Sequence, residues 1–320
     1  MKSLNFLFNS LLILAFVSFL NSNSLSPSAP VVVSSIFTLT GHTQPVYAIT
    51  YLNDSHLISG SGDTKIKMWF NGTFITDLGS TESPILSLIT HYGFFPISGS
   101  KNNNIRIWIP KLRNAFVDFS KQNGSILSLA TLPRFLIASG SSDHSIHIYN
   151  VTTRTFIRSI QSNSSVNSLI FFKQRHLLAA GYADSTIIIW NYRNGSEFTR
   201  INGHNGSVYA LVMLKNGNLV SASADKTIKI WNVSIVPPVL EKTLTSHNGE
   251  IKCLAVLLNG NLASGSTDFS IKIWDVNNGS VITTLLGHNG TVNDLAIDSK
   301  GYLASASDDK TIKIWNTTIF

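Results

Sequence analysis

The sequence predicts an all-β fold built from seven repeated units, and three observations lead to this prediction. First, the stretch SASADKTIKIWN at residues 221–232 returns as SASDDKTIKIWN at residues 305–316, with eleven of twelve letters unchanged. Second, an aromatic residue closes an apolar run every 39 to 43 residues, at Trp69, Trp108, Tyr149, Trp190, Trp231, Trp274 and Trp315. Third, short alternating runs of apolar and polar residues are separated by turn residues about every ten positions, which favours strands over helices.

Each unit is long enough for four short strands joined by tight turns. Asn-Gly pairs lie between apolar runs or directly after the aromatic, at residues 71–72, 194–195, 216–217, 259–260 and 278–279. Such pairs tolerate the positive φ angles of a two-residue hairpin. A lone four-stranded sheet cannot bury both faces, so neighbouring sheets must stack. We therefore expect a seven-bladed β-propeller of four-stranded antiparallel blades.

The two ends of the repeat region predict how the ring closes. The sequence stops five residues after Trp315, which leaves the last unit one strand short. Residues 36–39, Ile-Phe-Thr-Leu, form an extra strand before the first unit. We expect this N-terminal strand to complete the last blade and leave no open sheet edge.

Further residues recur at fixed distances before the closing aromatic. A turn residue stands six positions before it, and it is Asp in every unit except the second, which has Asn102. Ser stands four residues before the turn residue, except in unit four, which has Ala180. Histidine stands 27 residues before the aromatic in four units. The complete sets are His42, Ser59, Asp63 and Trp69; His204, Ser221, Asp225 and Trp231; His247, Ser264, Asp268 and Trp274; and His288, Ser305, Asp309 and Trp315.

With its Gly-His pairs and its period of about forty residues, the chain resembles the WD-repeat (WD-40 type) β-propeller family. Gly41-His42, Gly203-His204 and Gly287-His288 match the first pair of the family signature, and Trp274-Asp275 matches the closing pair. The resemblance covers residues 36–317, and units two to four depart most from the pattern. It implies that Asp bonds His, that His bonds Ser and that Ser bonds the indole of Trp, as a structural set.

Catalysis by the same residues is the alternative, because Ser, His and Asp also form hydrolase triads. An active site is needed once, whereas this set is complete in four units, so we expect a structural role and no enzyme activity. The sequence contains no phosphate-binding loop and no metal-ligand spacing, so we expect no cofactor and no metal. Cys253, the single cysteine, lies in an apolar run and is expected to be buried.

The net charge of +7 raises the possibility of a nucleic-acid partner. Many Lys and Arg residues fall in the strand before each closing aromatic, including Lys67, Arg106, Lys229, Lys272 and Lys313. These cations are spread around the predicted ring rather than gathered in a stripe. A nucleic-acid partner is therefore disfavoured.

The resemblance also indicates which residues project from the top face of the propeller. They stand three and five residues after the Gly-His histidine and one residue before the turn Asp. Our candidates for a partner-binding face are Tyr47, Leu86, Lys101, Leu127, Tyr209, Glu250, Lys252 and Asp308. Single exposed apolar residues without a function are the competing interpretation.

The first 24 residues have the layout of a secretory signal peptide. Lys2 is followed by an apolar stretch from Leu11 to Leu20 and then by small polar residues. Residues 25–35 read as a linker. An uncleaved membrane anchor or a cytosolic location is the alternative. Sequons for N-glycosylation are numerous, although Asn-Gly-Ser is also a good turn, and they occur at Asn53, Asn71, Asn123, Asn150, Asn163, Asn194, Asn205, Asn232, Asn278, Asn289 and Asn316.

Together these features predict a secreted, monomeric and non-enzymatic scaffold that presents its top face to a protein or peptide partner. We expect no membrane contact beyond an N-terminal anchor. The alternative function is a secreted propeller hydrolase or a lectin-like carbohydrate binder, which would place clustered acids or aromatics in the central channel.

Overall fold

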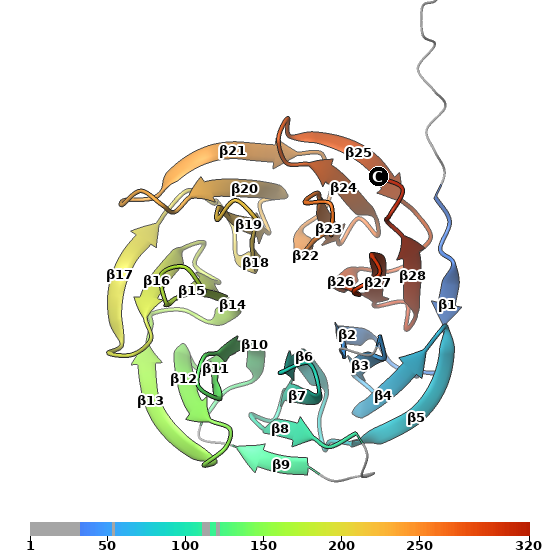
Figure 1. Cartoon of the computed structure of the whole chain (residues 1–320), viewed down its shortest axis with the longest axis horizontal. Coiled ribbons are helices and arrows are strands. Elements are labelled where there is room, and N and C mark those ends of the chain that lie inside the picture. Colours follow the sequence, from blue (N-terminus) through green and yellow to red (C-terminus); the bar gives the residue numbers. More distant parts are fainter. Residues whose placement is uncertain (1–32, 53–54, 111–115, 120–121) are drawn as a thin grey trace, which may run out of the picture. The chain divides into compact units, whose positions relative to one another are not determined.

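Seven four-stranded antiparallel sheets are arranged around a central axis (Figure 1). The computed structural model describes residues 33–52, 55–110, 116–119 and 122–320, and the predicted signal peptide lies outside them. Residues Val33–Phe320 form one compact unit. Within the described residues, all regular secondary structure is β-strand. The predicted all-β, seven-bladed propeller is confirmed.

The strands of blades one to six follow the chain from the axis outward, and blade seven takes its outer strand from the N-terminal part of the chain. The innermost strands are β2 (Val46–Tyr51), β6 (Ile85–His91), β10 (Ile126–Leu132), β14 (Val166–Phe172), β18 (Val208–Met213), β22 (Ile251–Val256) and β26 (Val292–Ile297). The second strands are β3 (Leu57–Ser61), β7 (Phe95–Ser100), β11 (Leu136–Ser141), β15 (Leu177–Tyr182), β19 (Leu219–Ser223), β23 (Leu262–Ser266) and β27 (Tyr302–Ser307).

The third strands carry the closing aromatics, and the outer strands form the rim. The third strands are β4 (Lys65–Phe70), β8 (Ile105–Trp108), β12 (Ser145–Asn150), β16 (Ile187–Asn191), β20 (Thr227–Asn232), β24 (Ile271–Asp275) and β28 (Ile312–Asn316). The outer strands are β5 (Thr73–Ser80), β9 (Phe116–Phe119), β13 (Thr155–Gln161), β17 (Ser196–Ile201), β21 (Val239–Thr245), β25 (Ser280–Leu285) and β1 (Phe37–Leu39).

Blade seven is closed by the N-terminal strand, as the sequence predicts. Its sheet has the order β1-β28-β27-β26, with Phe37 opposite Ile314 and Leu39 opposite Ile312. The backbone N–H of Ile36 adds a hydrogen bond of 2.7 Å to the carbonyl of Ile314. The edge of β28 is therefore paired rather than exposed.

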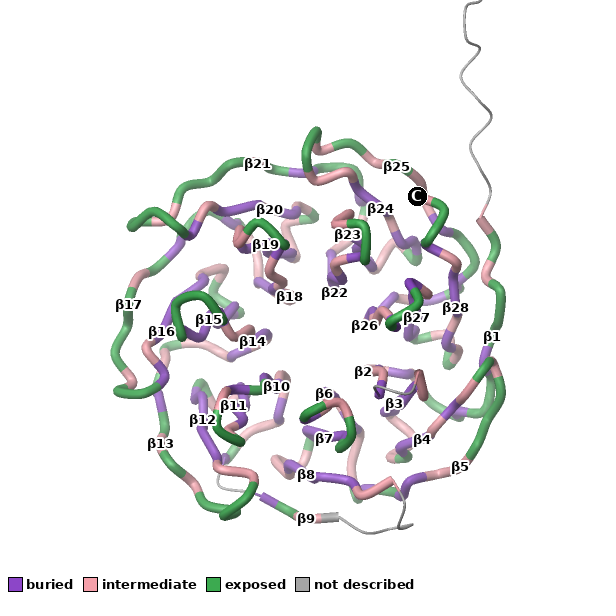
Figure 2. Tube along the Cα trace, in the orientation of Figure 1, coloured by how far each residue is buried: buried purple, intermediate pink, exposed green. Residues whose placement is uncertain are grey.

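The hydrophobic core lies between neighbouring blades. Figure 2 shows buried second and third strands and an exposed rim. At the junction of blades seven and one, Leu39, Val46, Trp69 and Ala304 belong to one buried cluster. Blades approach so closely that a Cβ on Gly60 would lie 2.5 Å from the side chain of Ile85 in the next blade. A side chain has no room at that position.

Because adjacent strands are antiparallel, each sheet has two distinct ends. We call the end with the second-to-third turns and the loops between blades the top face. The bottom face carries the first-to-second and third-to-fourth turns. In every second-to-third turn, the residue after the turn Asp or Asn has a φ between 66° and 73°, as at Thr64, Asn103, Lys226 and Phe269.

Candidate functional site

The repeated His, Ser, Asp and Trp residues form a continuous hydrogen-bonded chain inside each complete blade. In blade five, Trp231 Nε1 donates to Ser221 Oγ at 2.8 Å, and Ser221 Oγ lies 2.7 Å from His204 Nε2. His204 Nδ1 lies 2.7 Å from Asp225 Oδ2. Blades one, six and seven repeat these contacts at 2.7 to 2.9 Å, in the sets that begin with His42, His247 and His288.

The direction of donation in this chain follows from its two ends. An indole N–H can only donate, and an ionised carboxylate can only accept. The Nδ1–H of His204 therefore donates to Asp225, and because this ring is neutral, its Nε2 accepts from the hydroxyl of Ser221. The imidazole is neutral in this arrangement, and burial lowers the pKa of His204 despite the opposing effect of Asp225. The same net lowering holds for the pKa values of His42 and His247.

The turn aspartate is held by several donors at once. Oδ1 of Asp225 accepts from the backbone N–H and the hydroxyl of Thr227, and Oδ2 accepts from the N–H of Asn205. Burial acts to raise the pKa of Asp225, but these bonds and the bond from His204 outweigh it and lower the pKa to about 2. The carboxylate is thus ionised at neutral pH and is used to fix the turn.

Ser, His and Asp are connected as in a hydrolase triad, but the serine hydroxyl is buried. Ser59, Ser221, Ser264 and Ser305 are each 0% exposed. In every case the indole N–H of the blade's tryptophan donates a hydrogen bond to the serine oxygen. A nucleophile needs free access to a substrate carbon and an oxyanion pocket beside it. These serines have no such access.

Blades two to four satisfy the same positions with other residues. In blade two Trp108 Nε1 donates to Ser98 Oγ at 2.9 Å, and in blade three Ser139 Oγ donates to Gln122 Oε1 at 2.5 Å. In blade four, where Ala180 replaces the serine, Trp190 Nε1 donates to the hydroxyl of Tyr182 at 2.8 Å. The sequence pattern did not reveal Tyr182, because its hydroxyl comes from a position two residues further along.

A second group of predicted residues meets at the central channel. Tyr47, Leu86, Leu127, Tyr209 and Lys252 come from five blades and line one cavity of about 210 Å³, together with Asn167 and Asn293 of the other two. Each of the seven is the unpaired residue of a β-bulge between the first and second strands of its blade. A bulge re-aims the extra side chain. The apolar members Leu86 and Leu127 are half-buried.

Charged groups on the top face are linked to this ring. Lys252 Nζ lies 3.5 Å from the ring centroid of Tyr209 and 2.7 Å from Glu250 Oε2. The bond from Lys252 lowers the pKa of Glu250.

The remaining charged candidates lie beside the ring rather than on it. Asn293 Nδ2 donates to Asp308 Oδ1 at 2.8 Å, so Asp308 is joined to the ring through that amide. Lys101 is exposed in the turn of blade two, away from the cavity lining.

Many third-strand cations lie opposite a polar residue of the outer strand. Lys67 Nζ and Arg106 Nε lie 2.8 Å and 2.6 Å from Asp77 and Asp118, respectively. Lys229, Lys272 and Lys313 reach threonine hydroxyls of the neighbouring outer strand at 3.0 to 3.2 Å. These five side chains cross-link the third and fourth strands of their blades.

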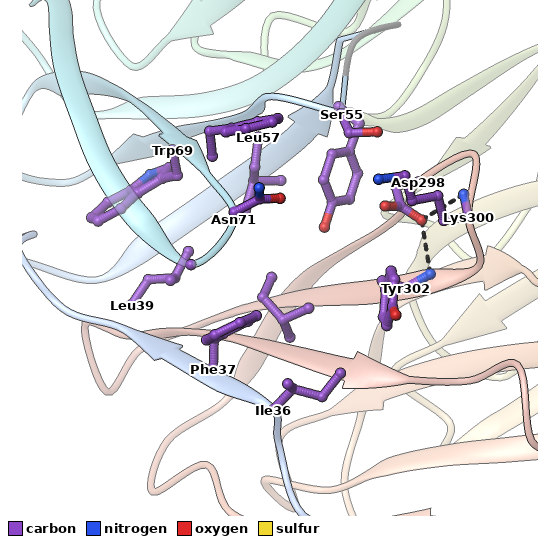
Figure 3. Close-up of a pocket in the computed structure, with 14 residues that line it drawn as sticks. Ile36, Phe37, Leu39, Ser55, Leu57, Trp69, Asn71, Asp298, Lys300 and Tyr302 are labelled. Carbon is purple, nitrogen blue, oxygen red and sulfur yellow. Dashed lines mark hydrogen bonds between the residues drawn. The ribbon is translucent and has the colours of Figure 1, made fainter.

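A second cavity, of about 350 Å³, lies where the ring closes, on the bottom side of blades one and seven. Figure 3 shows Phe37 and Leu39 of β1 on its wall, with Asp298 and Lys300 from the turn that follows β26. Asp298 Oδ1 accepts from the backbone N–H of Lys300 at 2.9 Å and of Tyr302 at 2.8 Å. That carboxylate shapes the turn.

Other features bear on the chemistry of the described residues. Cys253 is buried, and burial raises the pKa of its thiol. No cluster of three His, Cys, Asp or Glu suited to a metal occurs within the described ranges. No helix in that part of the chain is long and apolar enough to cross a membrane.

Comparison with known proteins identifies the repeats. A family profile described as "WD domain, G-beta repeat" matches residues 33–69, 154–191, 195–232, 238–275 and 279–316. The crystal structure of the WD40 beta propeller domain of Doa1 superposes with a TM-score of 0.81 and 22% sequence identity, over 90% of this chain and 98% of that chain. No curated protein sequence gives a significant match. The profile leaves residues 70–153 unmatched, a stretch that spans most of blades two and three.

Proposed function

Because the chain belongs to the WD domain, G-beta repeat family, we propose that it is a non-enzymatic scaffold whose top face binds a protein or peptide partner. One observation carries this proposal. Side chains from all seven blades meet around the channel mouth, at bulge positions where sheet pairing places no demand on residue identity. Tyr47 and Tyr209 supply aromatic area, and tyrosine is enriched at protein-binding hot spots. Lys252 adds a cation that can pair with an acidic group of the partner.

A non-enzymatic role agrees with the way the repeated polar sets are used. Each serine of a complete set already donates to histidine and accepts from tryptophan, and each partner is buried. The channel group of Lys252, Glu250 and Tyr209 contains one ion pair and one stacked cation. Neither arrangement leaves a free acid and base pair facing a cavity, which hydrolysis requires.

The test is affinity capture from the native host with the intact protein and with a Tyr47→Ala/Tyr209→Ala variant. We expect proteins captured by the intact chain to be lost with this variant, and the affinity for a purified partner to fall about tenfold or more. Phe198→Ala, which changes an exposed aromatic on the outer strand β17, is the matched control and should capture the same proteins. An identical set captured by all three proteins would contradict a top-face site.

We propose separately that residues 1–24 direct the chain into the secretory pathway. The support is the layout of that segment: Lys2, an apolar core and small polar residues at its end. The sequons are weaker support, because Asn194 and Asn278 Oδ1 each accept a backbone N–H within their turns, which explains these asparagines by turn chemistry. Sequencing the mature N-terminus after expression in eukaryotic cells, with N-glycosidase treatment, is the test. An intact Met1 in a cytosolic fraction would overturn this proposal.

A further inference from the structure

The turns of the bottom face bring together cationic residues that lie far apart in the sequence. First-to-second turns carry Arg134, Lys173, Arg175, Lys215 and Lys300, and third-to-fourth turns carry Arg154 and Arg193. All seven are exposed. Within the described part of these turns, Asp298 is the single acidic residue, and it is buried with its carboxylate bound to the turn backbone. The described turns of this face therefore carry an excess of positive charge.

These cations differ from the third-strand cations in their partners. Lys67 and Arg106 are buried and paired with carboxylates across the sheet. On the bottom face, Lys215 and Arg175 donate only to the backbone carbonyls of Leu258 and Ser234 in the next blade. Their charge is not neutralised, so it remains available to an external anion.

Large apolar side chains stand exposed on turns of the same face. Phe94 is 62% exposed, and Phe135 and Leu258 are each 50% exposed, although burial of such side chains is normally favoured. Ile235 and Val236 of blade five and Ile319 of the C-terminal tail are exposed to a similar degree. Apolar tips thus occur in blades two, three, five, six and seven. Phe135 directly follows Arg134 in the chain, and the carbonyl of Leu258 accepts from Lys215.

Contacts between blades join these turns into one surface. The rings of Tyr92 and Phe135, in the turns of blades two and three, lie 5.0 Å apart. The bonds of Arg175 and Lys215 connect the turns of blades four, five and six. Thr317 donates to the carbonyl of Gly301 and so ties the C-terminal tail to the turn of blade seven.

We propose that the bottom face docks on an anionic phospholipid bilayer, with the cations at the headgroups and the apolar tips inserted beside them. Exposed aliphatic and aromatic tips next to Lys and Arg are the features of proteins that lie on membranes. Single-stranded nucleic acid fits less well, because aliphatic side chains such as Leu258 and Ile235 cannot stack on bases. An acidic peptide would need a groove, whereas the cations and apolar tips are distributed over six blades. This docking is contrary to the sequence-based expectation of no membrane contact beyond an N-terminal anchor. Because the anionic leaflet of a cell membrane faces the cytosol, docking and secretion are alternative proposals, and a cleaved N-terminus in a secreted fraction would count against docking.

The charge requirement is tested by flotation with vesicles of phosphatidylcholine alone or mixed in equal parts with phosphatidylserine. We expect the full chain to bind only the mixed vesicles, with an affinity that falls as salt is added. In Lys173→Glu/Lys215→Glu/Lys300→Glu, we expect binding to weaken about a hundredfold or more, since each surface cation contributes roughly a fivefold factor. The matched control is Lys65→Glu/Lys226→Glu/Lys310→Glu, which makes the same charge change at exposed lysines of the top face and should leave binding within about twofold.

The apolar requirement is tested with a second matched pair. Leu258→Ser on the bottom face should weaken vesicle binding by roughly tenfold, because its inserted side chain is lost. Leu286→Ser, at a 68% exposed leucine in the top-face loop between blades six and seven, should leave it unchanged. Far-UV circular dichroism and thermal melts of every variant establish that the fold is retained.

Several outcomes would overturn the proposal. They are equal binding to both kinds of vesicle, equal loss in the two lysine triples, and displacement of bound protein by a polydeoxythymidine oligonucleotide that binds more tightly than the vesicles do. Asn194 and Asn278 lie in turns of the same face, so docking also requires these sequons to be free of glycans. Glycans found on both sites in the native protein would equally overturn it.

Discussion

At the residue scale, hydrogen-bond satisfaction explains why a few letters recur in this chain. Ser221 joins an indole donor to an imidazole acceptor inside a fully buried site, where an unpaired polar group is costly. The sequence allowed these sets to be located because four blades repeat them at fixed spacing. Tyr182 could not be located in that way, because its hydroxyl accepts from the indole of Trp190 at a position that is not part of the repeated pattern.

The first prediction concerns the turn aspartates of the complete sets. Asp225→Ala removes the acceptor for His204 and for the turn backbone, so we expect the free energy of unfolding to fall by about 1 to 3 kcal/mol. Chemical denaturation of the purified protein measures the change. Asp184→Ala in blade four is the control, because Asp184 is exposed and bonds only Thr186, and it should cost less. Equal losses in both variants would contradict the role given to the histidine.

The second prediction concerns the substitute hydroxyl in blade four. Tyr182→Phe leaves the buried indole N–H of Trp190 without an acceptor, which should cost about 1 to 3 kcal/mol. Adding Ala180→Ser restores the serine that other blades use at this point and should recover part of the loss. Thermal melts of the single and double variants give the answer. A double variant less stable than Tyr182→Phe would show that blade four cannot accept the usual arrangement.

At the element scale, the β-bulge decides which side chains reach the channel. The period of the repeat predicted the strands, but local alternation could not predict that residues 47, 86, 127, 167, 209, 252 and 293 are skipped by the pairing. The residue after the bulge then faces the next blade. Ser128 Oγ accepts from Leu169 N–H and Ser168 Oγ from Leu211 N–H, so this position links innermost strands.

The third prediction concerns Asp294, which occupies this linking position between β26 and β2. Its carboxylate accepts from the N–H of Ile49 and of Leu295, each at 2.8 Å, and burial raises its pKa to about 7 against these two bonds. The folded protein therefore holds the proton more tightly than the unfolded chain does. The contribution of Asp294 to stability is complete below about pH 4 and is lost as the pH rises to about 7.

Asp294→Ser keeps a hydroxyl acceptor, as in blades three and four, and removes the titrating group. Its stability relative to the original chain should improve by roughly 2 to 4 kcal/mol between pH 4 and pH 8. Denaturation at both pH values tests this. A stability difference between the two proteins that does not change with pH would disprove the assignment.

At the scale of the whole molecule, the ring is completed by strands from opposite ends of the chain. Counting the strands predicted this closure, because the last blade was one strand short and the strand at residues 36–39 belonged to no repeat unit. The charge of the bottom face could not be read from the sequence, because its cations lie in turns of four blades that only the fold brings together.

The fourth prediction follows from closure. Deleting residues 31–40 removes β1 and exposes the edge of β28 and the apolar cluster around Trp69. We expect aggregation or a large fall in melting temperature, because unpaired edges associate. Deleting residues 1–24 serves as the control and should leave the melting temperature unchanged. A monomeric and equally stable product of the first deletion would refute the role of β1.

Closure by β1 also means that the ring can be completed only at the end of biosynthesis. Thr38 and Lys313, which meet across the closing pair, are 275 residues apart in the chain. At a translation rate of about 5 to 20 residues per second, β1 leaves the ribosome roughly 15 to 60 seconds before its partner exists. Throughout that interval the nascent chain carries an unpaired strand at its beginning and an unfinished ring behind it. Synthesis of the last blade is therefore the step that converts an open, association-prone intermediate into a closed molecule.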